Sequence, residues 1–171
     1  MDLYDILETR YSVRSYASRE VPAEALDRIA AAFNAAPTAA NRQPLGLLLV
    51  KTAGREEALK RVYGRAWFTA APYVAVVCTV PGNAWVRSDG KNYADVDAAI
   101  AFQTLVLAAT AEGLGTCWIG AFDPAAAREE FGLPEGVEPV AMTPLGYPSS
   151  EARKPPRLRK PLDQIVHHDR W

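Results

Sequence analysis

The chain has 171 residues, of which 49% are hydrophobic, and its formal net charge is −1 at pH 7. This length and apolar content suit a single domain, residues 1–171, with its own core. The balanced charge argues against nucleic acid or a membrane surface as the main partner. The acidic N-terminal segment does not resemble a signal peptide, and no run approaches the roughly 20 apolar residues of a membrane helix, so we expect a cytoplasmic protein.

The sequence offers few side chains for metal binding or nucleophilic catalysis. Cys78 and Cys117 lie far apart, each in an apolar run, and form no metal or redox motif. We therefore expect two small buried thiols in a reducing compartment. The only histidines, His167 and His168, stand near the C-terminus without a nucleophile motif nearby. If the protein is an enzyme, its chemistry is therefore expected to come from a cofactor.

The N-terminal half alternates helical and strand patterns. Apolar spacing predicts one helix at 2–9 and a second that begins at Pro22 and ends before Pro37. Two short β-branched or aliphatic runs predict buried strands, and helical pieces separate them. The predicted strands are 45–51 and 73–80, and the helical pieces are 54–63 and 65–70.

The C-terminal half begins with a polar, mobile loop at 81–92. Residues 93–113 then form a helix that is apolar on nearly every side, which predicts burial all round, either centrally in its own domain or, more economically, against a second subunit. Further elements are a short strand at 116–119, a helix at 124–131 and a strand at 137–146. Because the strands are too irregularly spaced for βαβ units, we expect an α+β fold rather than a doubly wound sheet.

A candidate phosphate site follows the first helix. Arg10, Ser12 and Arg14 stand within five residues, together with Tyr11 and Val13. Guanidinium groups match phosphate oxygens with planar pairs of donors, and a serine hydroxyl adds a neutral donor. A solvated surface turn with ordinary ion pairs is the other interpretation, and the spacing alone leaves both open.

Residues 36–44 form a second candidate site between helix and strand. Pro37 and Pro44 enclose Thr38, Asn41 and Gln43, whose side chains offer donors and acceptors suited to a flavin edge or ribityl chain. An ordinary connecting loop that satisfies its own backbone groups is the alternative.

The segment 113–123 begins like a dinucleotide-binding motif. Trp118 stands where that motif requires its third glycine, and the segment follows a helix instead of a strand, so a Rossmann site is rejected. What remains is a glycine-flanked apolar turn whose backbone can approach a flat ligand closely.

The tail, residues 150–171, carries five basic residues within eight positions. Such a run is compatible with nucleic-acid binding or a disordered end. Interleaved apolar residues instead favour an arm that docks on another surface, such as a partner subunit, and brings cations to the phosphate site. The basic residues are Arg153, Lys154, Arg157, Arg159 and Lys160, and the apolar ones are Leu158, Leu162, Ile165 and Val166.

Taken together and in order, these segments resemble the compact branch of the nitroreductase family of FMN enzymes, from Leu3 to Trp171. The matching motifs are R-x-S-V-R, A-P-T-A-A-N-R-Q-P, G-L-G-T-C-W-I-G-A-F, P-L-G-Y-P and R-L-R-K-P-L. The resemblance implies an α+β sandwich with a mainly antiparallel sheet flanked by helices. It also implies an interlocked homodimer that exchanges its C-terminal arms and holds FMN at the subunit interface.

The resemblance also implies roles for individual residues. Arg10, Ser12 and Arg14 are expected to bind the FMN phosphate, with Tyr11 in a position that is often basic in relatives. Three further groups are expected to complete the site. The tail is expected to contribute Arg157, Arg159 and, more weakly, Lys160. The other subunit is expected to contribute Pro37, Thr38, Asn41 and Gln43. The backbone of Ile119, Gly120 and Ala121 is expected to lie along the flavin ring, with one amide donating to N5.

The implied activity is transfer of hydride from NADH or NADPH through FMN to a small acceptor, such as a nitroaromatic or a quinone, in a ping-pong cycle. Cationic groups and backbone amides near the flavin would favour its reduced form. Flavin destruction, reductive dehalogenation and dihydropteridine reduction on the same scaffold remain open. A flavin-binding sensor or storage protein without turnover is the alternative outside the enzymes.

Overall fold

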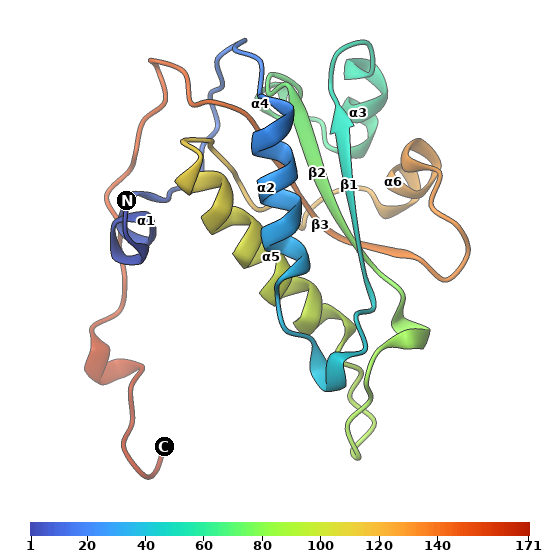
Figure 1. Cartoon of the computed structure of the whole chain (residues 1–171), viewed down its shortest axis with the longest axis vertical. Helices are drawn as coiled ribbons and strands as arrows, with labels where there is room; N and C mark the ends of the chain where they lie inside the picture. Colours follow the sequence, from blue (N-terminus) through green and yellow to red (C-terminus); the bar gives the residue numbers. More distant parts are fainter.

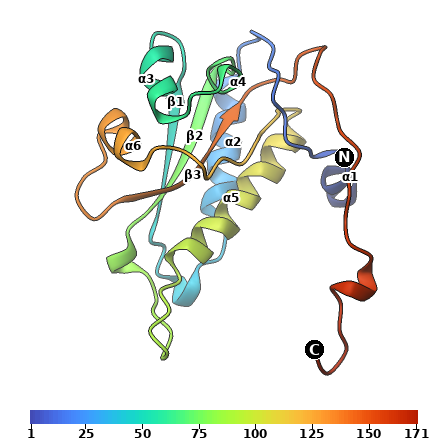
Figure 2. The ribbon, with the colours of Figure 1, turned by 180° about the vertical axis from the view of Figure 1, so that it is seen from behind.

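The computed structural model describes residues 1–171 and places helices on both faces of a small sheet (Figures 1 and 2). Its helices are α1 (Leu3–Thr9), α2 (Ala23–Asn34), α3 (Glu56–Val62), α4 (Ala66–Thr69), α5 (Ala94–Ala111) and α6 (Pro124–Phe131). Its strands are β1 (Leu45–Lys51), β2 (Tyr73–Thr79) and β3 (Glu138–Leu145). The predicted α+β sandwich with an antiparallel sheet is confirmed.

The sheet has the order β1-β2-β3, and both pairings are antiparallel. β2 lies in the middle with helices on both faces, which explains why its sequence is apolar without alternation. Val74 and Val76 enter the core beneath α3, α4 and α6, whereas Ala75 and Val77 enter the core beneath α2 and α5. The pairing with β3 shifts register after Val77.

Two apolar layers therefore stabilise the sheet. The larger one joins the sheet to α2 and α5, and the predicted apolar face of α2 is confirmed by its buried residues Leu26, Ile29 and Phe33. The second layer is built on fully buried side chains from the three short helices, which include Leu59, Phe68 and Ala127. Burial of each large side chain contributes about 1.5–3 kcal/mol relative to exposure.

α5 is not buried all round within the single chain, so its expected burial against a second subunit stays a prediction. Its inner side is buried against the sheet and α2, but Ala99, Ile100 and Gln103 are exposed, Ile100 by 39%. The expectation that no run approaches a membrane helix is wrong for α5. By length and composition alone this helix is long and apolar enough to cross a membrane, a test that the core helix of a soluble protein also passes.

Local capping explains several helix ends. Asp2 accepts a hydrogen bond from the Asp5 amide and forms a capping box at the start of α1. Asp123 caps α6 just before Pro124, which suits the first helical position. Gly113 follows α5 with φ +74°, a left-handed conformation that favours glycine and ends the helix.

Two predicted segments differ from the observed ones. The segment 116–119 is not a strand, because it contacts the irregular segment after α1 and the open edge of β3 only through isolated bridges, to Ser12 and Met142. The loop 81–92 contains a 3-10 turn at Pro81–Asn83. Its predicted mobility stays a prediction.

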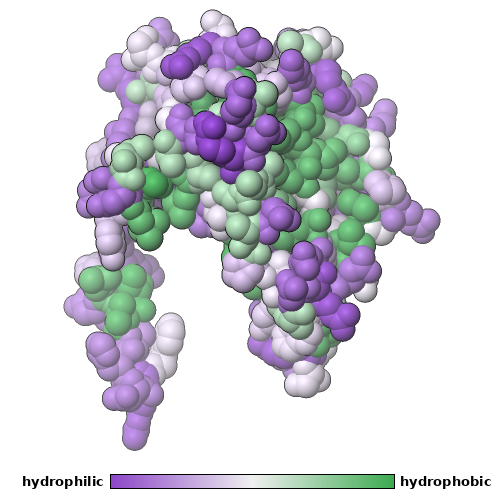
Figure 3. Space-filling model, in the orientation of Figure 1, coloured by the Kyte–Doolittle hydropathy of each residue, from purple (hydrophilic) through white to green (hydrophobic).

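The tail leaves the body beside α1 and extends away from it (Figures 1 and 2). From residue 153 onward every residue is exposed, including the 3-10 turn Leu162–Gln164. Figure 3 shows apolar surface on this tail and along β1 beside α2. The exposed large apolar side chains of the tail are Leu158, Leu162, Ile165, Val166 and Trp171.

Candidate functional site

The Arg10–Arg14 segment runs beside the turn that follows α5. The Val13 amide donates to the Thr116 carbonyl at 2.9 Å, and Ser12 forms a parallel bridge with Thr116. Val13 is 2% exposed and anchors the segment in the core. Because successive side chains of an extended segment point to opposite sides, Ser12 and Arg14 face away from the core.

Gly115 permits this close approach. A Cβ at position 115 would lie 2.6 Å from Val13 Cγ2 and 2.8 Å from Val13 Cβ. Gly115→Ala is therefore expected to lower the free energy of unfolding of the apoprotein by about 1–3 kcal/mol through overpacking, as measured by urea denaturation. Gly120→Ala is the control, because a Cβ at position 120 would meet only Trp118 Nε1 at 3.8 Å, an ordinary van der Waals contact, and the expected change is within about 0.5 kcal/mol. Equal losses in both variants would contradict this account.

The segment and the tail enclose a polar cleft of about 190 Å³. Five of the predicted phosphate ligands from the two ends of the chain line it, and Tyr11 also contributes; the five are Arg10, Ser12, Arg14, Arg157 and Arg159. Lys154, one of the cations that the basic tail was expected to bring, lines it as well. Pro155 and Pro156 complete the lining, and the sequence did not single them out. Lys160 does not line the cleft.

Two basic side chains hold the tail against the C-terminal end of α1. Lys154 Nζ donates to the Glu8 carbonyl at 2.8 Å. Arg157 Nη2 donates to the carbonyls of Leu7 at 2.7 Å and Arg10 at 2.8 Å. The last carbonyls of a helix lack partners within the helix and attract cations. Arg157 therefore anchors the tail with one of its nitrogens, a structural function that its position in the sequence does not reveal.

The cleft concentrates positive charge. Burial lowers the pKa of Arg10, and the nearby cations Arg157 and Arg159 lower it further. None of Arg10, Arg14, Arg157 and Arg159 forms an ion pair with a carboxylate. An anion in this cleft would relieve the mutual repulsion, so the electrostatics favour binding of a phosphate or another anion.

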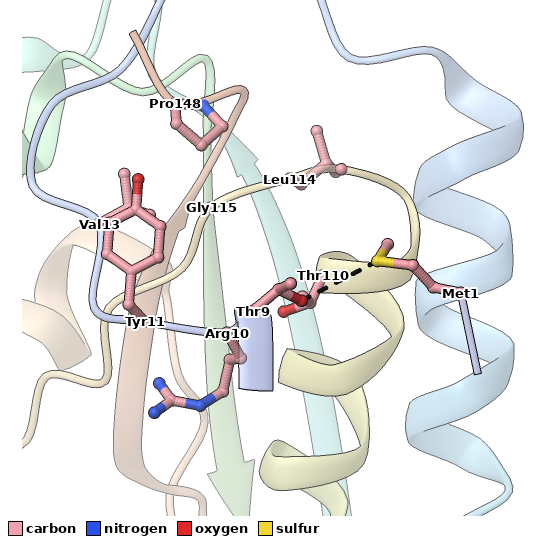
Figure 4. Close-up of a pocket in the computed structure, with 10 residues that line it drawn as sticks. Met1, Thr9, Arg10, Tyr11, Val13, Thr110, Leu114, Gly115 and Pro148 are labelled. Atoms are coloured by element: carbon pink, nitrogen blue, oxygen red, sulfur yellow. Dashed lines mark hydrogen bonds between the residues drawn. The ribbon is translucent and has the colours of Figure 1, made fainter. Parts of the chain in front are cut away.

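A second, more apolar cavity of about 210 Å³ adjoins the cleft. Figure 4 shows the Arg10 guanidinium directed away from Leu114 and Pro148, which lie on the opposite side of this cavity. Tyr11 lines both spaces. The charged end of Arg10 therefore belongs to the polar cleft, and the second cavity offers no comparable site for an anion.

The 117–121 segment has only part of its backbone free to meet a ligand. Ile119 exchanges two hydrogen bonds with Met142, from its amide at 2.8 Å and to its carbonyl at 3.0 Å, so the Ile119 amide is not available to a ring. Gly120 and Ala121 are exposed, and their amides donate no hydrogen bond within the chain. The candidates for a donor to the flavin are thus reduced to these two.

Cys117 connects this segment to the cleft. Burial raises the pKa of the Cys117 thiol. Arg14, Ser12 and Arg10 lie close enough to the thiol to act in the opposite direction and lower this pKa. The predicted burial of both cysteines as free thiols is confirmed. A thiol with a raised pKa remains protonated at neutral pH, so Cys117 packs as a small apolar residue.

The loop between α2 and β1 lies elsewhere. It includes a 3-10 turn at Ala39–Asn41 near one end of the molecule, whereas the chain after α1 lies toward the other end (Figures 1 and 2). Thr38 Oγ1 accepts a hydrogen bond from the Gln43 amide at 3.0 Å, and the Pro37 and Asn41 side chains are exposed. Within one chain these loop residues do not join the cleft.

Comparisons with known proteins agree with this architecture. A model of the nitroreductase family matches residues 7–147. A protein of Methanothermobacter thermautotrophicus, provisionally named an NADH dehydrogenase/NAD(P)H nitroreductase, is 34% identical, and the match covers 100% of this chain and 88% of that protein. The FMN reductase (NAD(P)H) of Bacillus subtilis is 29% identical over 94% of this chain and 70% of its own.

Solved structures give the same result. A nitroreductase family protein from Clostridium difficile superimposes with a TM-score of 0.86 at 32% identity and covers 100% of both chains. A small antiparallel sheet between two helical layers, with an arginine-lined cleft beside it, thus defines a protein of the nitroreductase fold. The chain belongs to the nitroreductase family.

Proposed function

We propose that this protein is an NAD(P)H-dependent FMN oxidoreductase that reduces a small acceptor. The observation that carries the proposal is the convergence of Arg10, Arg14 and Arg159 on one cleft without a carboxylate partner. The names of the relatives from M. thermautotrophicus and B. subtilis support the nicotinamide and flavin specificities.

The residues present fit FMN. Its phosphate needs charged donors, which Arg10, Arg14 and Arg159 supply, and Ser12 adds a hydroxyl. Its ring edge needs backbone donors. The unpaired amides of Gly120 and Ala121 can supply them, and both residues stand only a few positions after Cys117, which is buried beside the cleft. We propose that the partner subunit supplies the remaining flavin contacts through its loop, which contains Pro37, Thr38, Asn41 and Gln43.

Bound FMN would supply the N5 atom that takes hydride from reduced nicotinamide and passes it to an acceptor. The protein's contribution is to bind and orient. Fixed arginines and amides stabilise negative charge because they need no reorganisation during the reaction. The cleft contains no carboxylate or histidine, so the chain supplies no acid–base pair there. We propose that nicotinamide and a nitroaromatic or quinone acceptor use the same open face in turn, which makes the kinetics ping-pong.

We further propose that the working unit is a homodimer with exchanged C-terminal arms. The exposed side of α5 carries Ala99 and Ile100, and the apolar surface along β1 is also open (Figure 3). Exposed apolar side chains on the tail, such as Leu162 and Ile165, need a surface to cover them. The buried free thiols of Cys78 and Cys117 support a reducing, cytoplasmic location.

The purified protein is expected to bind FMN, and acid extraction should release FMN and not FAD. Under anaerobic stopped-flow mixing, NADH or NADPH should bleach the visible flavin band, and a quinone should restore it. Steady-state NAD(P)H oxidation in the presence of quinone should show parallel double-reciprocal lines, the pattern of a ping-pong cycle.

Two outcomes would overturn this proposal. A protein that refuses added FMN would exclude the flavin function. A bound flavin whose visible absorption is neither bleached by reduced nicotinamide nor restored by quinone would instead identify a sensor or storage protein.

A further inference from the structure

A buried carboxylate near the start of α5 has no function in the proposal above. Asp97 is 1% exposed, and its Oδ1 accepts a hydrogen bond from the Ala39 amide at 2.8 Å. Its other oxygen, Oδ2, is buried and accepts no hydrogen bond. Removing a carboxylate from water is costly unless hydrogen bonds compensate. The single bond to Ala39 is therefore the interaction by which Asp97 can contribute to function.

The loop that donates this bond has a strained backbone. Ala40, Asn41 and Gln43 have φ values of +50°, +53° and +50°, in the left-handed region that side-chain-bearing residues rarely adopt. Such conformations persist only where surrounding contacts enforce them, and they are concentrated at functional sites. Ala40 has no polar side chain with which to stabilise its own backbone. The conformation of this loop therefore requires restraint from outside.

The bond to Asp97 is the hydrogen bond that supplies this restraint. The other hydrogen bonds of residues 37–43 close the loop on itself: Asn41 donates to the Thr38 carbonyl at 3.0 Å, and Gln43 donates to Thr38 Oγ1 at 3.0 Å. Only the Ala39 amide is bonded to another element, through Asp97 of α5. Burial of this bond away from water strengthens it, because no solvent competes for the Ala39 amide.

We propose that Asp97 is a positioning residue that holds the strained loop so that Thr38, Asn41 and Gln43 can contact the flavin of the partner subunit. The restraint itself depends only on this chain, whereas the consequence for flavin rests on the proposed function. Because α5 also carries the exposed Ile100, the carboxylate connects the loop to the helix that we propose as the dimer interface.

The restraint is tested on the apoprotein by limited trypsin digestion at Arg42, an exposed loop residue. Asp97→Leu, which removes the acceptor, is expected to accelerate cleavage at Arg42 by about tenfold or more. Asp97→Asn keeps a carbonyl oxygen that can accept from the Ala39 amide, so trypsin should cleave this variant at Arg42 within about threefold of the wild-type rate. Thr52→Val is the control, because Thr52 is another buried residue with an unpaired hydroxyl and should leave this rate unchanged.

Equal cleavage rates for wild type and Asp97→Leu would overturn the inference, as would an Asp97→Asn protein that is cleaved as fast as Asp97→Leu. A measurement on the wild-type protein keeps the test decisive if Asp97→Leu does not fold. The Ala39 amide should exchange with deuterium about tenfold or more slowly than the Ala40 amide, which has no acceptor. Equal exchange would contradict the restraint.

The consequence for flavin is tested by titrating apoprotein with FMN. Asp97→Leu is expected to raise the Kd at least about tenfold, and Asp97→Asn should stay within about threefold of wild type. A loosened loop with unchanged FMN affinity would overturn the link to flavin. If wild-type protein itself binds no FMN, the proposed function fails, and digestion and amide exchange still decide whether Asp97 restrains the loop.

Discussion

Replacing Arg10 and Arg159 together with alanine is expected to raise the Kd for FMN at least about thirtyfold. Each charge-assisted hydrogen bond contributes about 1.5–3 kcal/mol, and neighbouring residues do not add fully. Without FMN, the double variant should be no less stable than the wild-type apoprotein. Burial and neighbouring cations already lower the pKa of Arg10, so its charged form is disfavoured in the folded state and its removal relieves repulsion. FMN titration and thermal unfolding of the apoprotein separate the two effects.

Arg61→Ala is the matched control, because Arg61 is an exposed arginine on α3 with a long ion pair of 3.9 Å to Glu130. Its FMN affinity should equal that of wild type. If the double variant retained the wild-type FMN affinity, the phosphate would have to bind elsewhere.

Ile100→Glu is expected to dissociate the proposed dimer and to release FMN at the same time. Ile100 is 39% exposed on the open side of α5, so the single chain should tolerate a carboxylate there. At a subunit interface, burial of an unpaired carboxylate costs several kcal/mol and should raise the dimer Kd about a hundredfold or more. Analytical ultracentrifugation measures the mass, and circular dichroism checks that the monomer remains folded.

Ile100→Val keeps the surface apolar and should remain dimeric. Deletion of residues 162–171 tests the arm in the same assay, because it removes Leu162 and Ile165 but leaves Arg157 and Arg159 in place. The deletion is expected to weaken the dimer. An Ile100→Glu protein that stays dimeric and flavin-bound would exclude α5 as the interface.

Periodicity in the sequence predicted most of the fold. Apolar spacing located α2, and continuous β-branched runs located β1 and β2, because burial imposes these patterns locally. The strand expected at 116–119 was wrong, because the bridges of this segment depend on neighbours that are distant in the sequence.

The candidate site was predictable only in part. The clustered arginines of the R-x-S-V-R motif and of the tail identified the cleft, and the structure brings Arg10, Arg14 and Arg159 together there. The anchoring function of Arg157 and the contact of Asp97 with Ala39 were not visible, because each joins segments far apart in the sequence. An isolated acidic residue near a helix start has many explanations, and only its burial together with its bond to the Ala39 amide points to the proposed restraint of the loop.

Binding of FMN compared with riboflavin tests most directly whether the arginine cleft recognises a phosphate. The two ligands differ only in that group, and the apoprotein can be titrated with each under identical conditions. We predict that FMN binds about a hundredfold or more tightly than riboflavin, and that added salt reduces this difference. Equal affinities for the two ligands would contradict the assignment of Arg10, Arg14 and Arg159 to the phosphate.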